Sequence, residues 1–192
     1  MITQPELWLL VGGNGSGKTT FYNRFLARRR IPLINADNIA RIMWPDAPEK
    51  HSYEAALIAE KERHRLLEER QSFCFETVFS HPSKVDFVGL AKAAGFRIRL
   101  FYFHLKLTSL NKARVASRVK SGGHNVPETK IAARIPRTLV NIRECIGLAD
   151  EQHLVDNSSL DQPYVRVAVW ENGQWQTCKK NLPCWAKDLI DT

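Results

Sequence analysis

One octapeptide constrains the fold of this chain more than any other feature. Residues 12–19 read Gly-Gly-Asn-Gly-Ser-Gly-Lys-Thr and match the pattern G-x-x-x-x-G-K-[ST] without a mismatch. Glycines in this pattern permit a tight turn that brings backbone N–H groups close to phosphate oxygens. Lys18 is expected to reach the β- and γ-phosphates of ATP, and the Thr19 hydroxyl is expected to ligate Mg²⁺. The residues predicted to hold the nucleotide are Gly12, Gly13, Asn14, Gly15, Ser16, Gly17, Lys18, Thr19 and Thr20.

The segments around this loop have the context that the motif requires. An apolar run of strand length, Leu7–Val11, precedes it, and Phe21, Phe25 and Leu26 follow with helical spacing. We expect this first helix to end at the basic triplet Arg28–Arg30, where positive charge suits the helix dipole. Strand candidates then alternate with helical stretches along the chain, which predicts an α/β fold of the P-loop NTPase class, nucleoside-kinase-like, with a parallel sheet flanked by helices. The further strands are expected at 32–35, 72–76, 96–105 and 153–158, and the further helices at 53–70, 80–94, 107–119 and 127–148.

The C-terminal part of the chain has a different pattern. Residues 164–170 alternate as a strand does, residues 171–173 carry a hairpin-turn signal, and residues 174–177 return. A β-hairpin and a short helix over 163–190 are therefore expected to pack on the edge of the sheet. We expect a single domain over 1–192 with its core at 6–158.

Composition and charge narrow the class of protein. The chain has 192 residues, 44% of them hydrophobic, and a formal net charge of +8, which favours anionic partners such as nucleotides, phosphorylated metabolites or nucleic acid. It contains no apolar run of bilayer-spanning length and no secretory signal pattern, which predicts a cytoplasmic protein with no membrane association. The four cysteines, Cys74, Cys145, Cys178 and Cys184, lack C-x-x-C spacing and are expected to be free thiols.

Two carboxylates follow predicted strands. Asp37 comes directly after the second strand, and Glu76 ends the third. Ligands of open α/β sheets bind outside the carboxyl ends of the strands, so both are expected beside the phosphate loop. Asp37 fits a general base that accepts a hydroxyl proton, although a helix N-cap is the alternative. Glu76, with Thr77 and Ser80 nearby, fits hydrogen bonding to an acceptor, although a solvent-facing strand end is the alternative.

Basic residues flank a Gly-Gly break at residues 121–127. Arginine donors stabilise the charge that spreads over the oxygens of a transferring phosphoryl group, and a glycine hinge between two arginine-bearing helices fits a mobile lid. Arg118 and Arg134 are the candidates for this catalytic role, and Arg114 and Arg137 compete with them by spacing. His124 in the break is expected to be a hydrogen-bonding loop residue, so that Thr19 is the only predicted metal ligand.

Together these blocks resemble the zeta toxin family of P-loop kinases. The resemblance covers roughly residues 6 to 158 and depends on the order of the blocks. It implies ATP-dependent phosphorylation of UDP-N-acetylglucosamine or a related nucleotide sugar, and an antitoxin protein as a possible partner. It also implies phosphate and Mg²⁺ binding by Lys18 and Thr19, a general base at Asp37, acceptor binding by Glu76 and Thr77, and a γ-phosphate clamp of Arg118 and Arg134. The matching segments are Gly12–Thr20, Asn35–Asp37, Phe75–Thr77 with Ser80, Arg114–Val115, Arg118–Val119, Gly122–Pro127, Arg134 and Asp156–Ser158.

Two further hypotheses remain beside a small-molecule kinase. The basic charge also fits a kinase acting on the 5′-hydroxyl of a nucleic acid, although the aromatic residues do not form the stacking pattern typical of single-strand binding. A nucleotide-binding toxin component that acts mainly through a protein partner, such as an acidic antitoxin, is the non-catalytic hypothesis. The sequence leaves the identity of the acceptor open.

Overall fold

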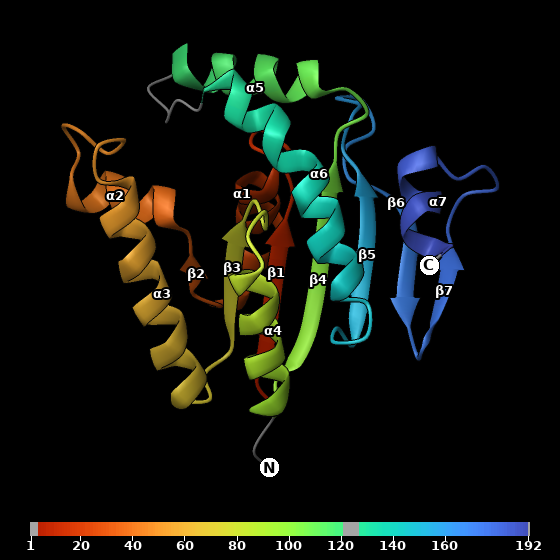
Figure 1. The fold of residues 1–192 in the computed structure, drawn as a ribbon, viewed down its shortest axis with the longest axis horizontal. Helices are drawn as coiled ribbons and strands as arrows, with labels where there is room; N and C mark the ends of the chain where they lie inside the picture. The colour runs from red at the N-terminus through yellow and green to blue at the C-terminus, as the bar shows by residue number, and fades with distance from the viewer. Residues whose placement is uncertain (1–3, 121–126, 192) are drawn as a thin grey trace.

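The computed structural model describes residues 4–120 and 127–191 of the chain. Within these residues, the strands form one seven-stranded sheet with the order β2-β3-β1-β4-β5-β6-β7 (Figure 1). The first five strands in chain order are parallel, and the last two run antiparallel to their neighbours. The strands are β1 (Glu6–Val11), β2 (Leu33–Ile34), β3 (Phe73–Thr77), β4 (Arg97–His104), β5 (Glu151–Asp156), β6 (Val165–Glu171) and β7 (Gln174–Thr177). The predicted α/β class, with a mostly parallel sheet flanked by helices, is confirmed.

The side chains of strand β1 contribute to two hydrophobic cores, one on each face of the sheet. Leu7, Leu9 and Val11 are fully buried in the larger core, where α3, α4, α6 and α7 cover one face of the sheet. Trp8 and Leu10 point to the opposite face, where they pack with the segment that follows the phosphate loop. A strand buried on both faces reads as a continuous apolar run rather than an alternating one, as the Leu7–Val11 segment does.

The helices place the site at the carboxyl ends of the parallel strands. Helix α5 lies across these strand ends, and α2 with α3 forms a separate pair beyond β2 (Figure 1). Because strand ends and helix starts meet there, this edge of the sheet is where polar side chains of many elements converge. The helices are α1 (Lys18–Phe21), α2 (Ala36–Met43), α3 (Ser52–Glu68), α4 (Ser83–Ala93), α5 (Thr108–Lys120), α6 (Glu128–Glu144) and α7 (Cys184–Ile190).

The segment after the phosphate loop is not the regular helix that its spacing predicted. Helix α1 ends at Phe21, a π-helical turn follows over Tyr22–Leu26, and a 3₁₀ turn over Ala27–Arg29 ends at Arg30 in the left-handed region. Aromatic packing accompanies the wider turn, since Phe21 and Phe25 pack against each other and both contact Tyr164. Local propensity alone does not reveal such a turn, because the Tyr164 ring comes from a distant part of the chain.

Helix α2 has no counterpart among the predicted helices. It begins after Asn35, whose side-chain oxygen accepts the backbone N–H of Asn38 at 3.1 Å. Asn35 is therefore the N-cap, and the alternative that assigned this role to Asp37 is wrong. The predicted break at 121–127 contains His124 and the hinge of the predicted lid. Its residues 121–126 lie outside the described residues.

The C-terminal hairpin has the expected turn chemistry. Asn172 and Gly173 both have positive φ angles, 54° and 79°, which the right-handed twist of a two-residue hairpin favours. Trp170 and Trp175 face each other across the two strands with ring centroids 5.7 Å apart. Among the described residues, no helix is long and apolar enough to cross a membrane. All four cysteines are free, as predicted, with Cys74 and Cys145 buried.

The half-buried His104 makes the stability of this fold depend on pH. Burial lowers the pKa of His104 to about 4, against a smaller opposing effect of Asp156. The ring stacks on Trp185 at 4.3 Å, and its Nδ1 lies 2.9 Å from the Tyr102 hydroxyl. The unfolded chain binds a proton near the ordinary pKa of histidine while the folded chain does not, so stability is lost as pH falls through this interval.

We therefore expect acidification from about pH 7 to about pH 4 to cost up to about 2–3 kcal/mol of unfolding free energy through His104. Urea unfolding at several pH values measures this cost. The His104→Gln variant should show a shallower decline than the wild type, whereas His81→Gln, at an exposed histidine, should keep the wild-type slope. Equal slopes for His104→Gln and the wild type would refute the assignment.

Candidate active site

The phosphate loop joins β1 to α1 and depends on glycine at two crowded positions. Gly12 has φ 148°, and a Cβ there would lie 2.4 Å from the Phe103 carbonyl oxygen. Gly17 has φ 95°, and a Cβ there would lie 2.4 Å from Nδ2 of Asn157. Both conditions exclude a side chain, because the backbone conformation and the nearby atoms each disfavour one. The glycines of the motif are thus required by packing as well as by the turn.

Three side chains from outside the loop hold its backbone. Asn111 of α5 donates to the Asn14 carbonyl at 2.8 Å, and Asn157 after β5 donates to the Ser16 carbonyl at 2.8 Å. The Tyr164 hydroxyl donates to the Gly17 carbonyl at 3.1 Å. These donors hold three of the loop carbonyls, while the Ser16 N–H closes the turn on the Gly13 carbonyl at 3.1 Å. Such a turn is the kind whose remaining N–H groups bind an anion.

Lys18 lies inside this loop. Its Nζ donates to the carbonyls of Gly12 at 2.8 Å and Gly13 at 3.1 Å, and it lies 3.9 Å from a Glu76 carboxylate oxygen. Burial lowers the pKa of Lys18, while Glu76 and Asp37 counteract that shift. The ammonium group is therefore held near two carboxylates, at the place where the motif predicts the β- and γ-phosphates.

Glu76 forms a tight contact with the last residue of the motif. The Thr19 hydroxyl lies 2.9 Å from Oε1 and 2.8 Å from Oε2 of Glu76, whose side chain is only 8% exposed. The register of the sheet explains the contact, because Leu10 of β1 pairs with Glu76 of β3 just before the loop begins. A hydroxyl and a carboxylate beside a phosphate site are the hard oxygen donors that Mg²⁺ prefers.

These two donors suit a Mg²⁺ ion that also binds nucleotide phosphates and water. The described residues contain no group of three or more His, Cys, Asp or Glu side chains that would bind a metal by themselves. Mg²⁺ in kinases is usually held by only one or two protein oxygens plus substrate phosphates, so the pair fits such an ion. The predicted metal ligand Thr19 therefore has a second candidate beside it, Glu76.

Most of the predicted site residues line one cavity. Its volume is about 740 Å³, and it lies at the carboxyl ends of β1 and β3. Thr77 lines it, but its hydroxyl also accepts the Phe79 N–H at 3.0 Å and so supports its own turn. Of the predicted nucleotide-binding residues, Gly12, Gly13 and Ser16 do not line the cavity. The predicted residues along the wall are Asn14, Gly15, Gly17, Lys18, Thr19, Thr20, Asp37, Glu76, Thr77, Ser80, Arg118 and Arg134.

The structure separates the competing arginines. Arg114 and Arg118 of α5 and Arg134 of α6 line the cavity. Arg137 is exposed on α6, and its Nε donates to the Ala133 carbonyl at 3.2 Å instead. Arg137 is thereby removed as a candidate for the γ-phosphate, and Arg114 remains beside Arg118 and Arg134.

Several cavity residues were missed by the sequence reasoning. Arg24, Arg63, Lys84, Asn157 and Tyr164 all line the cavity. Asn157 lies in the matching segment Asp156–Ser158 but was given no role there, and Tyr164 carries no local signal of its role. Arg63 does carry one, because it stands on the buried stripe of α3 formed by Ala55, Ala59, Arg63 and Leu66. A charged residue on an apolar helix face is a signal for a buried site.

The order of these elements has a counterpart among known families. Residues 7–137 match the profile of AAA_33, a family described as an AAA domain. The chain belongs to this AAA domain family. The match begins at β1, runs through the phosphate loop and extends into α6, so it includes Lys18, Asp37, Glu76 and the cavity arginines.

Individual proteins resemble the chain at low sequence identity. An uncharacterised protein of Haemophilus influenzae is 29% identical over 140 residues, which cover 69% of this chain and 99% of that protein. The crystal structure of the AvrRxo1-ORF1:AvrRxo1-ORF2 complex with sulphate ions aligns with a TM-score of 0.76 at 16% identity. That alignment covers 100% of this chain and 65% of the matched one, so the chain spans less than two thirds of the matched length. The same complex with ATP aligns with a TM-score of 0.72 at 16% identity over 92% of this chain and 61% of the other.

A toxin–antitoxin structure shares the fold as well. The PezAT system of Streptococcus pneumoniae aligns with a TM-score of 0.67 at 17% identity, covering 98% of this chain and 78% of the matched one. At these identities the solved structures establish the fold, which is that of a P-loop kinase-like domain.

Proposed function

We propose that this protein is an ATP-dependent kinase that transfers the γ-phosphoryl group to an alcohol hydroxyl of a small molecule. The observation that carries the proposal is one cavity in which Lys18 and Thr19 of the loop meet the carboxylates Asp37 and Glu76. Phosphoryl transfer demands little covalent chemistry from a protein. It needs a held polyphosphate, a positioned hydroxyl and cations near the moving phosphoryl group, and this cavity offers side chains for each.

Each group has a proposed task. The loop N–H groups and Lys18 bind the β- and γ-phosphates, and Arg118 and Arg134 offset the charge that develops on the γ-phosphoryl oxygens. Asp37 orients the acceptor hydroxyl and accepts its proton as the oxygen attacks. Thr19 and Glu76 would hold Mg²⁺, and the ion would neutralise phosphate charge. Arg114 is a further candidate for the γ-phosphate.

The acceptor is proposed from the resemblance to the zeta toxin family. A nucleotide sugar such as UDP-N-acetylglucosamine is the first compound to test. Ser80 and Thr77 line the acceptor side of the cavity, where their hydroxyls can hydrogen-bond to a sugar. The likeness to the PezAT system and the charge of +8 also support a proposed acidic protein partner.

A coupled ATP-consumption assay tests the proposal. Purified protein with Mg²⁺ and ATP is offered nucleotide sugars, nucleosides, phosphorylated metabolites and 5′-hydroxyl oligonucleotides. We expect turnover with at least one small molecule, a phosphate ester among the products by mass spectrometry and NMR, and loss of turnover when EDTA removes Mg²⁺.

The other outcomes decide against the proposal in different ways. Turnover only with oligonucleotides, weakened steeply by salt, would replace the acceptor by a nucleic-acid 5′-hydroxyl. Binding of ATP without transfer to any acceptor would refute the kinase and favour a nucleotide-binding toxin component that acts through a protein partner. Calorimetry that detects no binding of Mg²⁺–ATP would refute both.

A further inference from the structure

A buried arginine lies in the cavity away from the phosphate loop. Arg63 of α3 is 3% exposed and lines the cavity with Phe75 and Glu76 of β3. Moving a guanidinium from water into a protein interior costs several kcal/mol unless an anion or a set of acceptors compensates for it. Its place on the otherwise apolar stripe of α3 therefore calls for a partner.

Within residues 4–120 and 127–191, no ion pair or hydrogen bond of Arg63 is found, and its Nε is buried without an acceptor. The guanidinium instead contacts two aromatic rings, with Cζ 4.2 Å from the Phe75 centroid and 5.2 Å from the Phe87 centroid. Burial lowers the pKa of Arg63, and only the exposed Glu60 counteracts the shift. The rings hold the guanidinium in place but leave its hydrogen-bond donors unused.

A second cation converges on the same ring from another helix. Nζ of Lys84 in α4 lies 6.0 Å from the Phe75 centroid, and Lys84 also lines the cavity. Burial lowers the pKa of Lys84, the charge of Arg63 lowers it further, and Glu60 counteracts part of the shift. Two like charges that disfavour each other, with only the exposed Glu60 to offset both, favour an anionic ligand at this place.

Arg63 and Lys84 line the same cavity as Asp37, the proposed general base. Phe75 directly precedes Glu76 in β3, and the cavity lining also includes the small side chains Ala56 and Ala59 of α3. Because these side chains are small, the wall leaves space for a ligand rather than filling it. Nucleotide phosphates are already served by the loop and by the arginines of α5 and α6, so Arg63 and Lys84 remain for a different anion.

We propose that Arg63 and Lys84 bind a phosphate or carboxylate group of the acceptor, so that the substrate is an alcohol that carries an anion. The guanidinium fork suits two oxygens of such a group, and the ammonium adds a point charge. This inference rests on the proposed kinase function and narrows its acceptor class. Neutral sugars and nucleosides are then poor acceptors, whereas their phosphorylated or carboxylated relatives are good ones.

The test measures anion binding at this recess with the phosphate loop already occupied. The protein is saturated with Mg²⁺ and a non-hydrolysable ATP analogue and is then titrated in a calorimeter with inorganic phosphate or with acetate. We expect the wild type to bind at least one of the two anions, and Arg63→Gln and Lys84→Gln to weaken that affinity about tenfold or more. The anion that binds more tightly identifies whether the acceptor group is a phosphate or a carboxylate.

The control is Arg65→Gln on the same helix, because Arg65 is exposed and already paired with Glu62 and Glu69. It should bind the anion as the wild type does. Since Arg63 is buried, thermal melting is used to check that each variant folds. If Arg63→Gln does not fold, the partly exposed Lys84→Gln decides the outcome.

Two binding results would overturn the inference. One is anion affinity in a folded Arg63→Gln or Lys84→Gln equal to that of the wild type, and the other is no anion binding by the analogue-saturated wild type. Binding of the nucleotide analogue itself is measured first, and its absence would refute the kinase proposal instead. In the activity screen, turnover of neutral alcohols as fast as that of their anionic relatives would also refute the anion site while leaving the kinase in place.

Discussion

The Asp37→Asn substitution is expected to lower kcat roughly 10²–10⁴-fold while the affinity for Mg²⁺–ATP stays nearly unchanged. Asp37 lies in the first turn of α2, lines the cavity and acts electrostatically on Lys18. Asparagine keeps the shape of the side chain and its ability to hydrogen-bond, but it cannot take the proton of an attacking hydroxyl. The loss should therefore appear in the chemical step, measured as single-turnover phosphoryl transfer beside calorimetric ATP binding.

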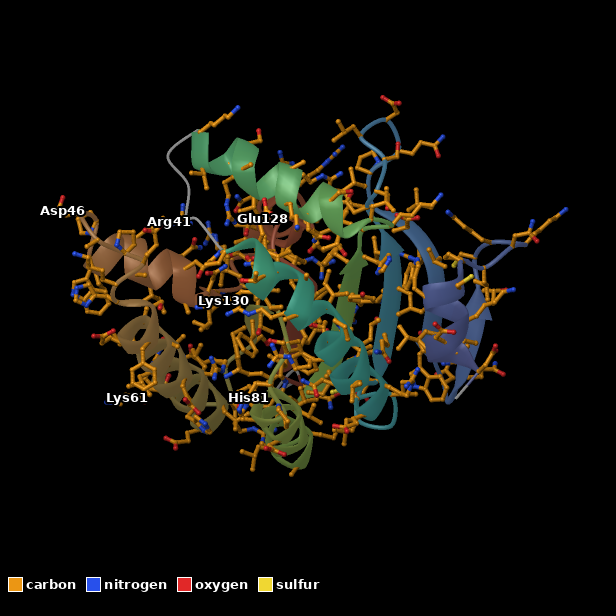
Figure 2. All side chains as sticks on the ribbon, turned by 45° about the horizontal axis from the view of Figure 1, so that its top comes forward. Arg41, Asp46, Lys61, His81, Glu128 and Lys130 are labelled. Atoms are coloured by element: carbon orange, nitrogen blue, oxygen red, sulfur yellow. The ribbon has the colours of Figure 1, made fainter. Side chains whose placement is uncertain are left out.

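The matched control is Asp46→Asn. Asp46 is exposed at the outer end of the α2–α3 pair, away from the strand ends (Figure 2). The Asp46→Asn substitution removes the same charge as Asp37→Asn from the same part of the chain, and it should leave kcat unchanged. Near wild-type turnover in Asp37→Asn would rule out Asp37 as the general base and leave Glu76 as the remaining carboxylate of the cavity.

Replacing Lys18 by methionine should reduce kcat/KM about 10³-fold or more, because the charge that Lys18 places beside the γ-phosphate is lost. Methionine is unbranched like lysine and only one heavy atom shorter, and it removes the ammonium. Folding should survive the change, since the variant no longer buries a charge whose burial already lowers the pKa of Lys18. Steady-state kinetics and a thermal melt on the same sample separate these two effects.

Lys61→Met provides the comparison for Lys18→Met. Lys61 is exposed on α3 and points away from the body of the molecule (Figure 2). It should show wild-type kinetics. An active Lys18→Met variant would remove the phosphate loop from the mechanism, and a variant that fails to fold would show that the hydrogen bonds of Lys18 to Gly12 and Gly13 are needed for the fold.

Local patterns in the sequence determined the class of fold and the centre of the site. The motif at residues 12–19 predicts a strand, a loop and a helix start because its chemistry depends on immediate neighbours. Asp37 and Glu76 could be placed on one edge of the sheet without coordinates, because parallel strands end on the same side. The same reasoning failed after Phe21, where packing against Tyr164 accompanies a π-helical turn in place of a regular helix.

Only the tertiary structure decided which side chains share the cavity. The rotation of α6 about its own axis brings Arg134 to the cavity and leaves Arg137 in solvent, and spacing alone could not choose between them. Asn111 and Asn157 hold loop carbonyls that lie 97 and 141 residues away in the chain. Arg63 is separated from Lys84 by a whole strand, although both lie against Phe75. Sequence periodicity reports on contacts a few residues apart, whereas these contacts depend on how complete helices dock on the sheet, and docking is determined by the packing of the whole core.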